Sequence, residues 1–398
     1  MTKRILFVDD EPSVLELYEL LFKRQQWEMD FAADGFQALK LMAASSYDAV
    51  VSDMRMPQLN GAQLLHEVAR LHPRTARFII SGYSDREMVM ECLPGTHQFL
   101  SKPFVIDDIR TKVLRSMEAN EWLVTDAMRD IVAKLFTLPS LPTSYFQLLR
   151  AIESPDATGE EVGAIISRDP AMTAKLLQLV NSAFFGLPRA ISNPIEAVLH
   201  LGMATVRSLA LGLHIVTEFN QYQTVQFPVQ TLMDHCVRTA NAARRIAQHE
   251  GAESSLVDGA FTAGLLMDIG TLVMVQNLAP EFEKAHELSR CEKKPLWQAE
   301  RDVLGVSHAE IGGYLLALWG LPVPIVEAVL HHHEPHRCTS REFSPLVCVH
   351  VSNALEHLPR EDDAPFTVPE VNAEWIDELG MTDRLQDWRQ LLNDSRTE

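Results

Sequence analysis

The chain has 398 residues, of which 46% are hydrophobic and 22% charged, and its formal net charge is −19 at pH 7. These values predict a soluble globular protein of roughly two or three domains. The acidic balance, with no dense Lys/Arg run, argues against direct binding to nucleic acid. The five cysteines are scattered without a zinc-binding spacing, which favours reduced buried thiols. The N-terminal apolar stretch is too short for a signal peptide, and no apolar run approaches membrane-spanning length. We therefore expect a cytoplasmic protein that does not bind membranes.

Short apolar runs alternate with amphipathic segments over the first 118 residues. Each run stops at polar residues, as expected for a buried parallel strand that ends in a loop. The strands predicted by this pattern are Ile5–Val8, Ala49–Ser52, Arg77–Ile80 and Gln98–Ser101. Strands and helices in alternation indicate an α/β fold with a doubly wound parallel sheet.

Polar residues with complementary chemistry follow these strands. They are Asp9, Asp10, Asp53, Ser81 and Lys102. Ligands of such sheets bind beyond the carboxyl ends of the strands, so these side chains are expected to lie together. Three carboxylates in one place repel one another unless a divalent cation lies among them, and oxygen ligands suit Mg²⁺. A hydroxyl and an ammonium group opposite would balance further negative charge, such as that of a phosphoryl group.

Residues 3–118 resemble the receiver domain of two-component response regulators. The motifs that carry the resemblance are Val8-Asp9-Asp10-Glu11, Ser52-Asp53-Met54-Arg55-Met56-Pro57, Ile80-Ser81-Gly82 and Leu100-Ser101-Lys102-Pro103-Phe104. The resemblance implies a receiver domain over 1–118 with a flavodoxin-like fold of five parallel strands. It also implies that a histidine kinase transfers a phosphoryl group to Asp53.

The same resemblance implies roles for the remaining motif residues. The implied Mg²⁺ ligands are Asp9, Asp10, Asp53 and the backbone carbonyl of Arg55, with Asp9 acting through water. Ser81 and Lys102 would contact the phosphoryl oxygens. Phe99 falls where the family places a switching aromatic, and an ordinary core aromatic is an equally good interpretation.

A connector over 119–137 follows this domain. Residues 105–136 contain no Gly or Pro. Positions there recur in alternating three- and four-residue steps and are apolar except for Glu121: Leu114, Met117, Glu121, Val124, Met128, Ile131 and Leu135. The spacing predicts either the seam of a short coiled coil, which would make a homodimer, or one amphipathic helix lying on its own domain. The Pro-rich stretch at 138–142 ends the helix.

Helical periodicity dominates residues 138–358, which predicts an all-α domain, and a helical tail follows over 359–398. Asp169-Pro170 has the form of a helix start. Polar residues with metal-binding chemistry are spread along apolar helices: His235, Asp268, His308, His331, His332, His333, His350 and Asn353.

This region, over about 138–340, resembles the HDOD family, a branch of the His-Asp metal-dependent phosphohydrolase superfamily. The motifs are Leu138-Pro139-Ser140-Leu141-Pro142, Asp169-Pro170-Ala171, Asn181-Ser182-Ala183-Phe184-Phe185-Gly186-Leu187-Pro188, Leu201-Gly202, Leu265-Leu266-Met267-Asp268-Ile269-Gly270, His308-Ala309-Glu310-Ile311-Gly312, Trp319-Gly320-Leu321-Pro322 and His331-His332-His333-Glu334-Pro335. Aligned by order, the superfamily's metal ligands fall at His235, Met267, Asp268 and Asn353. Met267 and Asn353 replace a histidine and an aspartate, so two of the four ligands are lost.

Two interpretations of this degenerate HD site stay open. His235, Asp268, His308 and the triple histidine would assemble a rearranged metal site, or Asp268 caps a helix or hydrogen-bonds within the core. The Gly-Tyr-Pro motif of the related cyclic-di-GMP phosphodiesterases is absent, because 336–339 reads His-Arg-Cys-Thr. Catalysis also needs an open coordination position, so we expect no catalytic residue in this domain.

The motifs together favour a cytoplasmic signal-transduction response regulator. Phosphorylation at Asp53 would change how a non-catalytic HDOD output domain binds a downstream protein partner. The alternative is a phosphorylation-regulated, metal-dependent phosphohydrolase acting on cyclic-di-GMP or another nucleotide. Transcription-factor output is disfavoured by the acidity and by the lack of a helix-turn-helix pattern after the connector.

Overall fold

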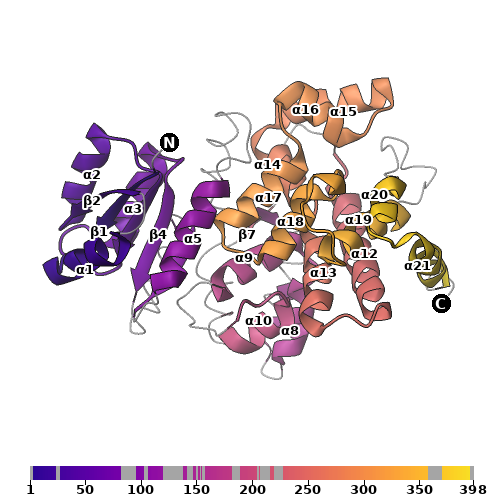
Figure 1. Cartoon of the computed structure of the whole chain (residues 1–398), viewed down its shortest axis with the longest axis horizontal. Helices are drawn as coiled ribbons and strands as arrows, with labels where there is room; N and C mark the ends of the chain where they lie inside the picture. The colour runs from indigo at the N-terminus through magenta and orange to yellow at the C-terminus, as the bar shows by residue number, and fades with distance from the viewer. Residues whose placement is uncertain are drawn as a thin grey trace.

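Five parallel strands form the N-terminal sheet of the protein, seen here in a computed structural model. They are β1 (Lys3–Val8), β2 (Trp27–Ala32), β3 (Ala49–Asp53), β4 (Ala76–Ser81) and β5 (Gln98–Ser101), in the spatial order β2-β1-β3-β4-β5. Around the sheet lie α1 (Pro12–Phe22), α2 (Gly35–Ala44), α3 (Gly61–Leu71) and α5 (Ile106–Ala119) (Figure 1). The predicted doubly wound, five-stranded parallel sheet is confirmed.

The described residues leave several gaps in the chain. The structure describes residues 3–23, 27–81, 96–102, 106–119, 138–140, 147–148, 151–152, 154, 157–181, 189–203, 206, 216–218, 227–356 and 370–394.

The strand register brings the polar strand ends to one edge of the sheet. Val8 of β1 pairs with Ser52 of β3, so Asp9 and Asp53 end adjacent strands side by side. β1, β3 and β4 are central in the sheet. They are buried on both faces, so their sequences read as nearly continuous apolar runs. β2 is an edge strand of mixed burial, which explains why its sequence shows no continuous apolar run.

Helices build almost all of the second region. In chain order they are α8 (Gly159–Ile166), α9 (Pro170–Val180), α10 (Pro194–Leu201), α12 (Val229–His249), α13 (Ser254–Leu266), α14 (Ile269–Asn277), α15 (Ala279–Glu292), α16 (Leu296–Leu304), α17 (His308–Leu318), α18 (Val323–His331), the short 3-10 helix η3 (Pro335–Arg337), α19 (Pro345–Glu356), α20 (Ala373–Glu378) and α21 (Thr382–Asp394). One short parallel pair, β6 (Leu138–Ser140) with β7 (Val216–Glu218), departs from the all-helical prediction. The helical fold class is otherwise confirmed.

One helical stretch corrects the prediction that no apolar run approaches membrane-spanning length. Ser254–Asn277, which covers α13 and α14, is long and apolar enough by length and composition, with a mean hydropathy of 1.5. Of its most apolar window, 78% is buried inside the protein. The stretch is therefore explained as core, because α13 packs against α12 and α19 and α14 packs against α17.

The start of the predicted connector packs on the first domain. Met117 of α5 is fully buried in the core of the sheet, and Leu114 packs against the same cluster. For these two residues the helix lies on its own domain, as one of the two alternatives predicted. The other seam positions, Val124 to Leu135, lie outside the described residues, so the coiled-coil alternative stays a prediction.

The described C-terminal helices pack back onto the helical region. Trp388 of α21 is fully buried, and its indole N–H donates to Glu250, which follows α12, over 2.8 Å.

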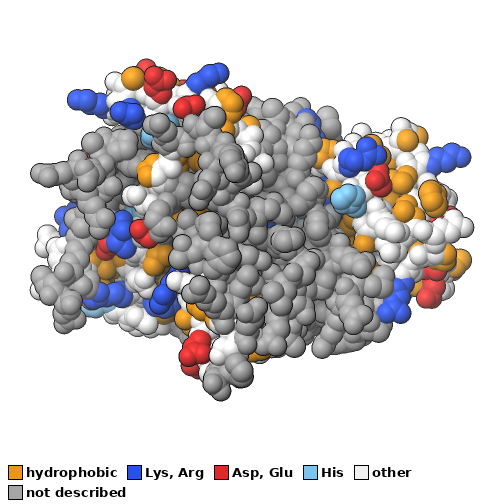
Figure 2. Space-filling view, turned by 180° about the vertical axis from the view of Figure 1, so that it is seen from behind, with side chains coloured by type: hydrophobic (Ala, Val, Ile, Leu, Met, Phe, Trp, Pro, Cys, Tyr) orange, Lys and Arg blue, Asp and Glu red, His pale blue; other side chains and the backbone are white. Residues whose placement is uncertain are grey.

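On the face in Figure 2, described basic side chains are scattered among acidic and apolar ones rather than gathered in one patch.

Candidate functional site

The strand ends of the N-terminal sheet form an acidic pocket closed by one lysine. The ammonium Nζ of Lys102 lies 2.5 Å from Asp53 Oδ1 and 3.3 Å from Asp9 Oδ2. The other Asp53 oxygen accepts the backbone N–H of Arg55 over 2.7 Å, and Asp9 Oδ1 accepts that of Glu11 over 3.0 Å. Both aspartates are buried, with 1% of Asp9 and 7% of Asp53 exposed.

Burial and charge act against each other in this pocket. Burial raises the pKa of Asp9 and of Asp53, and the neighbouring Lys102 partly offsets the rise. The two carboxylates in turn raise the pKa of Lys102 against its own burial. One ammonium group cannot neutralise two buried carboxylates and Asp10, which is exposed beside them. The donor set is all oxygen and short of positive charge, which fits the Mg²⁺ that receiver domains generally bind.

Two predicted site residues are placed by backbone alone. Ser81 ends β4 and pairs in register with Ser101, while Phe99 pairs with Ile79. Ser81 therefore lies on the strand next to that of Asp53, at the same end of the sheet, and Phe99 lies on the edge strand one position further out. Their side chains lie outside what the structure describes, so their predicted roles stay predictions.

Close packing fixes the turn that carries Asp53. α3 begins with a capping box in which Asn60 and Gln63 satisfy each other's backbone N–H groups. The next residue, Gly61, lies so near the Asp53 carbonyl oxygen that any Cβ there would collide with it. A larger residue at 61 would displace the strand end that presents the Asp53 carboxylate.

In the helical region, the residues aligned with the superfamily's metal ligands have taken other partners. His235 Nε2 lies 2.9 Å from Asn353 Oδ1, which fits an N–H donated to the amide oxygen. Met267, at the end of α13, is fully buried in the hydrophobic core. His235 and Asn353 therefore bind each other, and burial lowers the pKa of His235.

Asp268 instead faces three histidines that lie far away in sequence. The potential ligand atoms of Asp268, His308, His332 and His333 all lie within 4.8 Å of one another. Asp268 Oδ1 is 3.2 Å from His308 Nε2 and 3.8 Å from His332 Nε2, and His333 Nε2 is 3.0 Å from His308 Nε2. The sequence analysis left open whether Asp268 joins a rearranged metal site. Its contacts with His308 and His332 match part of that predicted site, and His235 is not part of the group.

Electrostatics in the cluster follow from its carboxylates. Burial would lower the pKa of His308, but Glu300 and Asp268 raise it to about 10. Burial would likewise raise the pKa of Asp268, and His308 instead holds it well below its usual range. Burial lowers the pKa of His332 to about 4, although the Asp268 carboxylate, 3.8 Å from its Nε2, opposes the shift.

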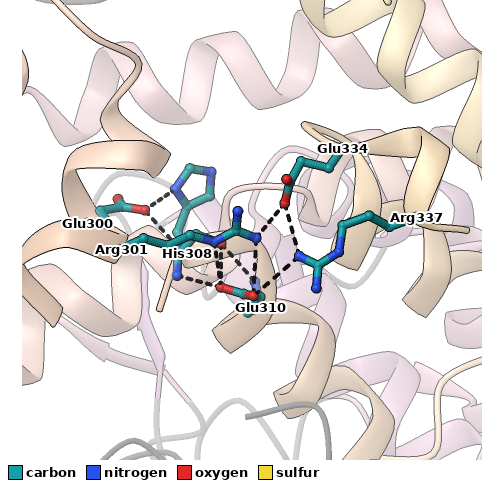
Figure 3. Close-up of polar contacts among 7 residues, drawn as sticks. Glu300, Arg301, His308, Glu310, Glu334 and Arg337 are labelled. Carbon is teal, nitrogen blue, oxygen red and sulfur yellow. Dashed lines mark hydrogen bonds and ion pairs between the residues drawn. The ribbon is translucent and has the colours of Figure 1, made fainter. Parts of the chain in front are cut away.

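An ion-pair network locks the cluster's supporting segments together. Arg301 of α16 pairs with Glu310 over 3.1 Å and with Glu334 over 2.5 Å, and Arg337 pairs with Glu334 over 3.0 Å. Glu310 also accepts the Ser307 N–H in the capping box that starts α17. Figure 3 shows these side chains converging beside His308 from α16, from α17 and from the segment after α18.

The N-terminal domain also contacts the helical region directly. The Gln98 amide, at the start of β5, donates to Ser116 Oγ over 2.9 Å and to the Leu318 carbonyl of α17 over 3.1 Å. Gln178 of α9 donates to the His97 carbonyl over 3.2 Å. α5 packs along α17 at the same boundary, as Figure 1 shows.

Family comparisons cover most of the chain. The response regulator receiver domain family matches residues 5–114, and the HDOD domain family matches residues 138–335. The chain is a response regulator with a receiver domain and an HDOD domain. HDOD domains are relatives of the HD superfamily.

Individual relatives match different lengths of this response regulator. Sporulation initiation phosphotransferase F of Bacillus subtilis is 30% identical over 114 residues, which are 28% of this chain and 92% of that protein. An uncharacterized protein of Treponema pallidum is 30% identical over 224 residues, which are 56% of this chain and 42% of that protein. The chain thus spans less than half the length of the Treponema relative.

A solved structure shares the fold over a longer stretch. A virulence factor from Campylobacter jejuni has a TM-score of 0.51 and 19% identity, and the match covers 68% of this chain and 95% of that one. At this identity the likeness concerns the fold alone.

The sequence analysis missed two sets of contacts. Glu300 is fully buried against His308, but the sequence shows only a glutamate in an amphipathic helix. Its place beside Ala299 on the buried face of α16 is the one hint. Gln98 and Gln178 are 5% and 2% exposed, and glutamine ordinarily indicates a solvated position.

Proposed function

We propose that this response regulator accepts a phosphoryl group from a histidine kinase at Asp53 and that phosphorylation changes how its HDOD domain binds a downstream protein. Mg²⁺ would be held by Asp9, Asp10, Asp53 and the backbone carbonyl of Arg55. It would neutralise the carboxylates and the incoming phosphoryl charge. Ser81 and Lys102 would contact the phosphoryl oxygens, and Phe99 would respond as the switching aromatic.

The observation that carries this proposal is the position of β5. The strand is four residues long. Lys102, which pairs with Asp53, follows its carboxyl end, and Gln98 at its other end donates to the HDOD carbonyl of Leu318. A strand of this length is a stiff connection, because its backbone is hydrogen-bonded to β4.

Phosphorylation acts first on Lys102. The new phosphoryl oxygens compete with Asp53 and Asp9 for its ammonium group, so the lysine must change partners. Any resulting shift of β5 changes the contacts of His97 and Gln98 with α9 and α17. A phosphoryl group biases the HDOD domain only through such a difference in contacts between two states.

The test of this proposal measures phosphoryl uptake together with the capture of protein partners. The full chain would be treated with acetyl phosphate and Mg²⁺, and partner capture would be compared between wild type and Asp53→Asn. We expect uptake and a change in capture for wild type alone. If Asp53→Asn takes up as much phosphoryl group as wild type, Asp53 is not the acceptor.

We propose that the HDOD domain is not a hydrolase. Metal-dependent hydrolysis needs an open coordination position for water. The bond between His235 and Asn353, and the burial of Met267, support the loss of the HD ligand set. Incubation with cyclic-di-GMP and Mn²⁺ tests this proposal, and turnover that Asp268→Ala abolishes would establish the phosphohydrolase alternative instead.

We further propose a cytoplasmic protein with a receiver at 1–118, a connector at 119–137, an HDOD domain at 138–358 and a helical tail at 359–398. The family matches at 5–114 and 138–335 support the first and third ranges. A homodimer through the connector would appear as a doubled scattering mass that depends on phosphorylation, and an unchanged monomeric mass would contradict it.

A further inference from the structure

We propose that Asp268, His308, His332 and His333 form a binding site for one zinc-like transition-metal ion in the HDOD domain. Of the positions that the sequence analysis aligned with the superfamily's metal ligands, the proposed site includes Asp268. It leaves out His235 and Asn353, which bind each other. It stands independently of the phosphorylation mechanism, since it requires nothing of the receiver.

The spacing of the four ligand atoms fits one small ion. Tetrahedral ligands at the usual zinc distances of about 2.0–2.1 Å lie about 3.3 Å from one another. The measured separations are 3.0 Å between the His333 and His308 nitrogens, 3.2 Å from His308 to Asp268, and 3.8 Å from His332 to Asp268. Small adjustments of side chains would bring all four to bonding distance.

An unsatisfied nitrogen faces the same point. His332 is 1% exposed, and its Nε2 has no hydrogen-bond partner among the described residues. Its Nδ1 lies 2.8 Å from the Val329 carbonyl, so Nδ1 carries the proton and Nε2 presents a lone pair. A buried nitrogen left unpaired costs free energy, and an ion beside it would remove that cost.

Neighbouring side chains also orient His308 and His333. His308 Nδ1 lies 2.7 Å from Glu300 Oε2, which leaves its Nε2 facing Asp268 and His333. Such a carboxylate behind a histidine is the usual support of a metal ligand. The His333 ring stacks on Trp297 with centroids 5.7 Å apart. The Arg301 network in Figure 3 then holds the helix starts that carry His308 and the segment that carries His333.

Ligand chemistry selects the ion. Three imidazole nitrogens and one carboxylate suit Zn²⁺ and related transition metals, whereas Mg²⁺ prefers oxygen. Four protein ligands fill a tetrahedral site and leave no place for water, so the ion would be structural. It would join the start of α14, the start of α17 and the end of α18.

Metal analysis and cobalt spectroscopy of the full chain test this site. The apo chain would be dialysed against Zn²⁺ or Co²⁺ with excess Mg²⁺ present to occupy the receiver pocket. We expect about one retained ion per chain and the intense visible absorption of tetrahedral Co²⁺. Absence of both would overturn the proposal and would indicate that the Nε2–H of His308 instead donates a hydrogen bond within the cluster.

Three variants make the assignment specific. His332→Gln and His333→Gln should each weaken Zn²⁺ binding by more than about tenfold. His331→Gln is the matched control, because His331 belongs to the same run but not to the cluster. His333 is only partly buried, so its variant keeps the test valid even if His332→Gln folds poorly. Zn²⁺ binding by both cluster variants at wild-type affinity, or equal loss in the control, would contradict the site.

Discussion

The receiver pocket and the histidine cluster solve the same electrostatic problem with opposite ligand chemistry. In the receiver, oxygen atoms of Asp9 and Asp53 meet at the ends of parallel strands, with Lys102 between them. In the HDOD domain, three imidazoles surround the single carboxylate of Asp268. The first set suits a hard cation and an exchangeable phosphoryl group, and the second suits a permanently held transition metal. Under the two proposals above, the first is a switching site and the second a structural site within one chain.

The largest expected effect concerns the switching site alone. Asp53→Asn should reduce phosphoryl uptake from acetyl phosphate to background, because an amide is a poor nucleophile for the transfer. Asp34→Asn is the control, since Asp34 caps α2 and asparagine caps helices equally well. Radiolabel incorporation measures both variants, and equal labelling of the Asp53 variant and wild type would contradict the assignment.

The structural site depends on a close approach between α14 and α17. Gly270 lies against the His308 carbonyl oxygen, and a Cβ there would collide with backbone. We expect Gly270→Ala to destabilise the chain by about 3 kcal/mol in urea unfolding and to weaken Zn²⁺ binding. Gly259→Ala in α13 meets only an ordinary contact at 3.4 Å, so it should be neutral or stabilising by up to about 1 kcal/mol. Equal losses of stability and of Zn²⁺ binding in the two variants would contradict a specific role for the close approach of Gly270 to His308.

The boundary between the domains can be loosened without touching either site. Gln98→Ala and Gln178→Ala each remove a buried donor, which should cost about 1–3 kcal/mol apiece. Hydrogen exchange should then accelerate around Leu318 and His97, while Zn²⁺ binding stays unchanged. No change in exchange at either position would show that these bonds do not hold the domains together.

The smallest expected effect is a pH dependence at the same boundary. Lys175 contacts Gln178 and the Trp319 ring, and burial lowers its pKa from 10.5 to about 7. Between these pH values the unfolded chain binds a proton that the folded chain lacks, so stability from this group rises with pH. The gain from pH 7 to pH 8 is about 1 kcal/mol.

Lys175→Met removes this titration and is the direct comparison. The variant's unfolding free energy should rise less between pH 7 and pH 8 than that of wild type. Buried thiols such as Cys348, whose pKa is raised, titrate equally in both proteins and cancel from the difference. Parallel pH profiles would contradict a lowered Lys175 pKa.

The receiver was more predictable from sequence than the HDOD domain for a geometric reason. Parallel strands end at one edge, so Asp9, Asp53 and Lys102 were expected together as soon as their strands were recognised. Edge strand β2 gave no apolar run of its own, and the five-stranded count came from the family resemblance. The roles of Ser81 and Phe99 stay predictions.

No comparable rule predicts which side chains of packed helices will meet. His235 and Asn353 lie 118 positions apart and meet through α12 and α19, and no local pattern indicates that they would bind each other. The spacing of Leu114 and Met117 fits a coiled coil and a receiver-packed helix equally well. The structure places these two residues against the sheet, and the coiled coil further along the connector stays a prediction. Gln98 was unpredictable because its partner, Leu318, lies 220 residues away.

The most direct test of the central claim follows hydrogen exchange at the domain boundary after phosphorylation. The full chain would be measured with and without acetyl phosphate and Mg²⁺, beside Asp53→Asn. The account predicts a change in exchange at the end of α17 and in α9 for wild type only. Unchanged exchange in both helices of a fully phosphorylated wild-type chain would contradict transmission through β5.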